Sequence, residues 1–302
     1  MSRVTWRSIA ALLVAVTLWG LAPVGNRYLV TRYDPLAILA LRFAVASIAF
    51  VPMLRGGKAW PTSYRIRTLL VISGIVGILG YNLPVTFGQQ TTTAGMAGLI
   101  IASEPIWILL IWCLFERRRP SLQAGLGALI GLVGIVLILA AQHADDLTLS
   151  TGLAGPLAIL VAAIAWSLYC VLMRDVSAAY GPVRATALTI QIGTLPMLVV
   201  GGGPAWQMMD GLPLHDLVIM LVLTLGSTVI AVLLWNRASA EIGATRAGPF
   251  LYLIPLISII GGAVMLDERP SLQVLIGGCV ILLGVVIASM SRRATTALAK
   301  AD

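Results

Sequence analysis

Ten apolar stretches, each about as long as a membrane-spanning helix, dominate this chain. They cover residues 8–29, 36–54, 68–88, 93–115, 122–140, 152–173, 183–201, 216–236, 244–266 and 271–290. A hydrocarbon core about 30 Å thick needs about 20 apolar residues in helical conformation. Only 11% of the 302 residues are charged, whereas a soluble domain is about one quarter charged. The stretches therefore predict an all-α polytopic membrane protein with ten transmembrane helices. The first stretch is too long for a signal peptide and has no small-residue cleavage site, so we expect it to remain as the first helix.

The basic residues predict the orientation of these helices. Of the 20 Lys and Arg residues, three (Arg27, Arg32 and Arg269) fall in connections on one side, and Arg42 falls inside a helix. The other 16 fall on the side that holds both termini. Cytoplasmic connections carry such an excess, so both termini are expected in the cytoplasm and the protein in the inner (plasma) membrane. This bias accounts for the net charge of +8 without a nucleic-acid partner.

A five-residue repeat divides the chain into two halves. The sequence RPSLQ occupies 119–123 and recurs at 269–273, an offset of 150. Five helices separate the copies, and five is odd, so the second copy lies on the opposite side of the membrane. Trp19 and Arg27 also match Trp166 and Arg174 at an offset of 147. The repeat predicts two inverted five-helix units, which we place at residues 1–143 and 144–302.

The sequence resembles the EamA-type family of the drug/metabolite transporter superfamily. The matching residues are "LWGLAPVGNR", "ALRFAVA", "ASEPIWILLIWCLFERRRPSLQAGLGALIGLVGIVLIL" and "LIPLISIIGGAVMLDERPSL". In this family a Gly-Glu pair usually precedes the turn after the fourth helix, whereas Phe115-Glu116 and Asp267-Glu268 stand here. The resemblance implies the ten-helix fold and a transporter, and it leaves the solute open, because family members carry very different compounds.

Arg42 and Glu104 are the two ionisable residues well inside the predicted helices. A charge at the bilayer centre costs at least about 2.5–3.5 kcal/mol, so both are expected to face protein or a cavity. At 1.5 Å per residue, Glu104 lies about 16 Å and Arg42 about 9 Å from the outer helix ends. The pair is either a buried ion pair that joins the second helix to the fourth, or a substrate-binding or proton-responsive pair. Their matches in the second half are Gln191 and Ile254, so any ion chemistry is asymmetric.

Several other residues near the same depth are candidates for the substrate site. Pro105 and Pro255 occupy matching places and predict either passive kinks or hinges. Trp19 and Trp166 lie too deep for interfacial anchoring, so they either contact substrate or pack between helices. The remaining binding candidates are polar or aromatic side chains, namely Asn82, Gln191 and Tyr252.

Small residues and cysteines are expected to serve packing. Gly127 and Gly131 form a GxxxG pattern in the fifth helix, which favours close internal packing. In the family the fifth and tenth helices tend to lie outside the cavity, so Gly127 and Gly277 could also support a homodimer. The three cysteines and two histidines have no spacing typical of a metal site, and we expect no metal or other cofactor.

These features favour a secondary transporter over an enzyme. The best expectation is export of small metabolites such as amino acids by alternating access, coupled to protons or another ion. Uptake or exchange of a nucleobase, a sugar or an organic cation is the alternative, and an enzyme acting on a lipid-linked substrate is a weaker one. No GxxxxGK[ST] motif is present, so ATP-driven pumping by this chain is not expected.

Overall fold

The computed structural model describes residues 6–55, 63–145, 152–242 and 247–290, which form ten membrane spans and no strand. The spans of the first half are α1 (Trp6–Val30), α2 (Pro35–Phe50) with η1 (Val51–Leu54), α3 (Tyr64–Ser73) with η2 (Gly74–Leu79) and α4 (Gly80–Gly88), α5 (Ala94–Ile101) with α6 (Glu104–Phe115), and α7 (Leu122–Asp145). Those of the second half are α8 (Ala154–Tyr180), α9 (Pro182–Met209), α10 (Leu214–Leu221) with η3 (Val222–Ile230) and α11 (Ala231–Ile242), η4 (Gly248–Tyr252) with α13 (Leu253–Leu266), and α14 (Leu272–Ser289). The ten predicted helices are confirmed, although several are longer than expected. The predicted start of the ninth stretch, at residue 244, lies outside the described residues.

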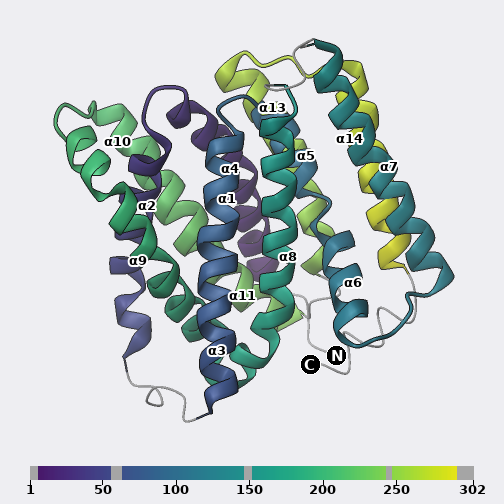
Figure 1. Cartoon of the computed structure of the whole chain (residues 1–302), viewed down its shortest axis with the longest axis horizontal. Helices are drawn as coiled ribbons and strands as arrows, with labels where there is room; N and C mark the ends of the chain where they lie inside the picture. Colours follow the sequence, from purple (N-terminus) through teal and green to yellow (C-terminus); the bar gives the residue numbers. More distant parts are fainter. Residues whose placement is uncertain (1–5, 56–62, 146–151, 243–246, 291–302) are drawn as a thin grey trace.

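The spans run side by side and alternate in direction (Figure 1). We call the side on which α1 begins and α14 ends the inner face, and the opposite side the outer face. At one edge of the molecule α7 packs along α14, and at the other α2 packs along α9. The remaining spans fill the space between these two pairs.

The duplicated RPSLQ segment is a helix start. In the first copy Ser121 Oγ accepts a hydrogen bond from Ala124 N at 3.2 Å, and in the second Ser271 Oγ accepts one from Val274 N at 3.4 Å. A serine at this position satisfies one of the amide groups that the first turn of a helix leaves free. The backbone just before each copy is also alike, because Arg117 and Asp267, 150 residues apart, adopt positive φ angles of 50° and 54°. The repeat therefore preserves a turn and cap, while its charge differs between the two faces.

Glycines bring α7 and α14 into backbone contact and show the inverted symmetry directly. A Cβ atom on Gly127 would lie 2.6 Å from the carbonyl oxygen of Gly284, and one on Gly134 would lie 2.7 Å from that of Gly277. Gly127 matches Gly277 and Gly134 matches Gly284 in the repeat, so the two contacts exchange when the halves are exchanged. These glycines are covered within one chain, which corrects the expectation that Gly127 and Gly277 could support a homodimer.

Three pairs of spans carry matching features. The third and eighth spans each contain a π-helical segment (η2 and η3). The fourth is interrupted by a turn between α5 and α6, and the ninth changes from the 3₁₀ segment η4 to α13. The second and seventh begin at Pro35 and Pro182, an offset of 147. This offset aligns Arg42 with Thr189, which corrects the expected match with Gln191 at an offset of 149.

Candidate functional site

A break in the fourth span places Glu104 at the start of a helix. α5 ends at Ile101 and α6 begins at Glu104, so Ala102 and Ser103 form a turn between them. Ser103 stabilises the turn, because its Oγ donates to Ile100 O at 2.6 Å and accepts from Trp107 Nε1 at 3.1 Å. Glu104 is therefore in the first turn of α6, where the helix dipole favours a negative charge.

The side chain of Glu104 is the central feature of the candidate site. Its Oε1 atom is buried and has no hydrogen-bond partner among the described residues. The carboxylate interacts electrostatically with Tyr81 of α4 and Cys170 of α8. Ser167 Oγ of α8 donates to the backbone carbonyl oxygen of Glu104 at 3.1 Å, so elements of both halves meet at this residue. A buried polar atom without a partner is costly, and it marks a place where a ligand can supply the missing hydrogen bond.

Arg42 is hydrogen-bonded to Asn26 of α1 and not to Glu104. Its side chain is 7% exposed, and Nη1 donates to Asn26 Oδ1 at 3.1 Å, while Nε has no partner among the described residues. Asn26 in turn donates to Gln89 Oε1 at 2.8 Å. Arg42 and Glu104 form no salt bridge, which corrects the alternative of a buried ion pair joining the second helix to the fourth. Tyr81 lies within electrostatic range of both Arg42 and Glu104.

The two predicted tryptophans have different surroundings. The Trp166 ring lies 5.1 Å from Tyr81 and 4.9 Å from Tyr169, centroid to centroid, which places it in the aromatic group beside Glu104. Trp19 instead donates from Nε1 to the carbonyl oxygen of Ser227 at 2.9 Å, and its ring lies 5.4 Å from that of Trp235. The contact with Ser227 falls in η3, so Trp19 packs α1 against the eighth span.

Three other predicted binding residues are engaged in contacts between or within helices. Asn82 donates to Ile78 O at 2.8 Å in its own span. Gln191 exchanges hydrogen bonds with Ser47, donating to its carbonyl oxygen at 2.9 Å, and so joins α9 to α2. The Tyr252 hydroxyl donates to Ser289 Oγ of α14 at 3.4 Å. These contacts do not connect the three side chains with Glu104.

The two predicted hinge prolines lie next to the helix breaks. Pro105 is the second residue of α6, and Pro255 is the third residue of α13, which follows the 3₁₀ segment η4. A proline in the first turn of a helix has no intrahelical hydrogen bond to lose. The helix irregularities therefore lie just before the prolines: a turn at Ala102 and Ser103 interrupts the fourth span, and a change from 3₁₀ to α-helix precedes Pro255 in the ninth.

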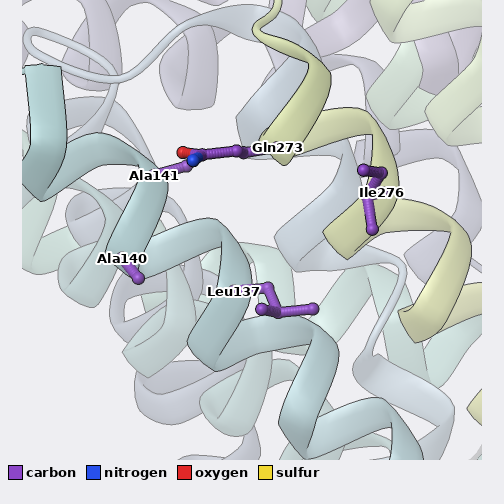
Figure 2. A pocket seen from close by; sticks show the side chains of 5 residues that line it. All are labelled: Leu137, Ala140, Ala141, Gln273 and Ile276. Carbon is purple, nitrogen blue, oxygen red and sulfur yellow. The ribbon is translucent and has the colours of Figure 1, made fainter.

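A pocket of about 260 Å³ lies elsewhere, between α7 and α14 towards the outer face (Figure 2). Its lining is Leu137, Ala140, Ala141, Gln273 and Ile276, which is apolar except for Gln273. The glycine contacts explain its position. Near the inner face, a Cβ atom added at Gly127 or Gly284 would lie 2.4 Å from the nearest backbone atom. Further towards the outer face, a Cβ atom added at Gly134 or Gly277 would lie 2.7 Å from its nearest neighbour, so the contact is looser there. The helices separate towards the outer face, so the pocket is a packing gap at the edge of the molecule rather than part of the Glu104 site.

Two residues of the Glu104 group were not selected from the sequence. Cys170 is one of the cysteines that are expected from the sequence to serve packing, and Tyr81, the neighbour of the candidate Asn82, is not among the expected binding residues. The match between Trp19 and Trp166 was the available signal, since Cys170 lies one turn beyond Trp166.

Within the described residues, no three His, Cys, Asp or Glu side chains are grouped as a metal site would require.

Comparison with known proteins assigns the chain to a family. The profile of the EamA-like transporter family matches residues 6–140 and 153–290, one match in each half. An uncharacterized transporter of Archaeoglobus fulgidus is 27% identical over 93% of this chain and 98% of its own length. The uncharacterized transporter YdfC of Bacillus subtilis is 30% identical over 89% of this chain and 87% of its own.

Two further similarities bear on fold and solute. A probable terminal-alkyne amino-acid exporter of Streptantibioticus cattleyicolor is 24% identical over 93% of both chains. A solved crystal structure has the same fold, with a TM-score of 0.58 and 22% identity over 95% of this chain and 98% of its own. With both repeats matched and ten membrane spans described, the chain belongs to the EamA-like transporter family.

Proposed function

We propose that this protein is a secondary transporter that exports small metabolites such as amino acids by alternating access. The observation that carries the proposal is the buried Glu104 Oε1 atom, which has no hydrogen-bond partner at the break in the fourth span. Broken helices at matching places in inverted repeats are typical of substrate sites in such transporters. An acidic group in the membrane interior is a site for substrate or for a coupling proton.

The charges around Tyr81 favour an amino acid as the solute. A zwitterion offers an ammonium group to the Glu104 carboxylate and a carboxylate to the Arg42 guanidinium, whose Nε also lacks a partner. Both charged side chains interact with Tyr81, so one small molecule could reach both. The amino-acid exporter among the relatives supports the same class of solute.

A small organic cation is the second candidate. Tyr81, Trp166 and Tyr169 form an aromatic group beside Glu104, and aromatic faces attract cations. Such a solute would need Glu104 and the rings but not Arg42. Transport by an Arg42→Gln variant therefore separates the two candidates, because only the zwitterion loses a partner.

We also propose that the chain lies in the inner (plasma) membrane with both termini in the cytoplasm, and that residues 1–143 and 144–302 are its two repeat units. The excess of Lys and Arg on one side supports the orientation, and the two family matches, one in each half, support the units. Reporter fusions at residue 302 test the orientation: a cytoplasmic reporter should be active there and a periplasmic one inactive.

Solute counterflow in liposomes that contain only the purified protein tests the proposed function. The panel covers amino acids, nucleobases, sugars and small organic cations. We expect amino acids to accumulate, and Glu104→Gln to reduce the rate at least about tenfold with folded yield unchanged. Asp267→Asn is the matched control, because Asp267 is an exposed acid on the outer loop and asparagine tolerates its positive φ. Full activity of Glu104→Gln, or no counterflow with any solute of the panel, would overturn the proposal.

A further inference from the structure

Two consecutive residues near the outer end of α1 join that helix to neighbours on both sides. Arg27 Nε lies 3.5 Å from Glu268 Oε1, in the connection after α13. The hydroxyl of the next residue, Tyr28, is hydrogen-bonded to Nε2 of His215 in α10 at 2.8 Å. We call these four residues the outer clamp.

Two consecutive residues near the inner end of α8 make the corresponding contacts. Arg174 Nη1 lies 3.6 Å from the Oε1 atom of Glu116, which follows α6 directly. Asp175 Oδ2 accepts a hydrogen bond from Arg65 Nη2 of α3 at 2.5 Å. We call these four residues the inner clamp.

The inverted repeat relates the two clamps. Arg27-Tyr28 and Arg174-Asp175 are 147 residues apart, the offset that also relates Trp19 to Trp166. Arg65 and His215 are 150 residues apart, and each is the second residue of its helix. Glu116 and Glu268 lie in the connections that follow α6 and α13, but they are 152 residues apart, so the repeat matches their connections and not the two positions themselves. Two contacts of similar placement therefore lie at each face of the membrane.

The ion pair of the outer clamp is largely buried and has additional partners, whereas the ion pair of the inner clamp is exposed. The other contact of the outer clamp, between Tyr28 and His215, is exposed. The side chains of Arg27 and Glu268 are 22% and 12% exposed, against 58% and 40% for Arg174 and Glu116. Arg27 Nη1 donates to the carbonyl oxygens of Gln89 and Gln90 at 2.5 and 2.6 Å. Glu268 Oε2 accepts from Ala94 N, the first amide of α5, at 2.8 Å. One ion pair thus joins four spans, α1, α4, α5 and α13, at the outer face.

We propose that the outer and inner clamps are the two gates of the transport cycle, and that the outer gate is the firmly closed one in this structure. The inference rests on the proposed function, because alternating access requires each face to open while the other stays closed. Removing one partner from a buried charged pair destabilises it strongly, whereas an exposed pair contributes little. Breaking the outer clamp should therefore cost more free energy than breaking the inner clamp, so the outer face should open less often than the inner face.

A native cysteine reports opening of the central site without any transported solute. Cys170 is partly exposed and lies within electrostatic range of Glu104, so its labelling rate from one face reports how often a path from that face to the central site is open. In a Cys113→Ala/Cys279→Ala background, a membrane-impermeant maleimide is added to one face of oriented proteoliposomes. We expect Glu268→Gln to raise the labelling rate from the outer face at least about tenfold. Glu116→Gln should raise labelling from the inner face by less than about fivefold.

Matched variants make the result specific. Asp267→Asn changes the adjacent, 91% exposed acid and should leave Cys170 labelling unchanged. Tyr28→Phe removes the hydroxyl that contacts His215 and Asp216 and should raise outer labelling in the same direction as Glu268→Gln, by a smaller factor. The proposal is overturned if Glu268→Gln and Tyr28→Phe, both folded, label Cys170 from the outer face as slowly as the parent does.

Cross-linking tests the need for opening. A reducible dithiol cross-linker between Arg27→Cys and Glu268→Cys should stop counterflow, and a reductant should restore it, because a linker spans a gap that is too wide for a direct disulfide. The control joins Ala141→Cys to Gln273→Cys, whose side chains face each other across the α7–α14 pocket (Figure 2). It should leave counterflow intact, because neither position belongs to a clamp and α7 packs along α14 over the rest of its length. If no solute is transported but Glu268→Gln still exposes Cys170, the gate assignment stands and the proposed function fails. If transport is found and Cys170 stays protected, the gate assignment fails.

Discussion

Replacing Gly127 by alanine should weaken the crossing of α7 and α14, which joins the two halves of the protein. The added Cβ would lie 2.4 Å from Ala288 N and 2.6 Å from Gly284 O. Ordinary contacts of a Cβ atom lie at 3.4–4 Å, so the two backbones would have to separate by about 1 Å. Both contacts are to backbone atoms, so no side chain can rotate away to relieve them.

The magnitude follows from a matched control in the same helix. At Gly125 the nearest atom to an added Cβ is Pro120 Cγ at 4.0 Å, so Gly125→Ala creates no clash. Both substitutions gain the same helix propensity, about 0.5–1 kcal/mol. The difference between them is therefore the cost of overpacking alone, typically about 1–3 kcal/mol. We expect Gly127→Ala to be less stable than the native protein and Gly125→Ala to be as stable or more stable.

Thermal unfolding of the purified variants in one detergent measures this difference through the intrinsic fluorescence of the tryptophans. In soluble chains of 150–250 residues, 1 kcal/mol moves the Tm by about 2–4 °C, so a gap of several degrees is expected. Equal Tm values for Gly127→Ala and Gly125→Ala would refute the close backbone contact. A lower Tm for Gly125→Ala would show that α7 is packed on a different face.

Two further predictions concern the connection between α1 and α2. The Asp34 side chain accepts hydrogen bonds from Leu36 N at 2.8 Å and Ala37 N at 3.1 Å, and so caps the start of α2. Asp34→Ala should therefore lower the free energy of unfolding by about 0.5–2 kcal/mol, measured by thermal or denaturant unfolding. Asp34→Asn should be nearly neutral, because asparagine caps a helix equally well. The hydrogen bond to Asp216 and burial raise the pKa of Tyr33 from 10.0 to about 12. This preference for the neutral phenol stabilises the fold below pH 10 and is lost as the pH rises through about 12. In Tyr33→Phe the Tm should therefore fall less between pH 10 and 12 than it does in the native protein. Tyr64→Phe is the control, because Tyr64 is exposed and its loss should leave the fall in Tm unchanged. An equal fall in Tm for the two variants would count against the Tyr33 contact.

The sequence was sufficient for the spans and the repeat because these depend on local patterns. Apolar length predicts the spans, and the Pro-Ser pair predicts where the fifth and tenth helices begin. Glu104 was also predictable, since an acid deep in a membrane helix must face protein. The turn before Glu104 was predicted only as a kink or a hinge, because a proline marks the place where a helix weakens and not where the chain turns.

Contacts between distant spans could not be predicted in the same way. The pairing of Gln191 with Ser47 and of Trp19 with Ser227 depends on which faces of α2, α9 and the eighth span meet. Neither polarity nor depth distinguishes these residues from ones that face the candidate site. The π-helical segments are a similar case: no proline lies in η2 or η3, so their unwinding has no local signal.

The structural devices of the fold are duplicated, but the charges of the candidate site are not. Glycine contacts, helix starts, π segments, helix irregularities and clamps all occur twice, so opening at either face can use the same kind of movement. Glu104 has Ile254 at its matching position, and Arg42 has Thr189. A symmetric scaffold alone would give the inward-open and outward-open forms similar energies. The bias between them must therefore come from residues that differ between the halves. The burial of the ion pair in the outer clamp and the single carboxylate at Glu104 are two such differences.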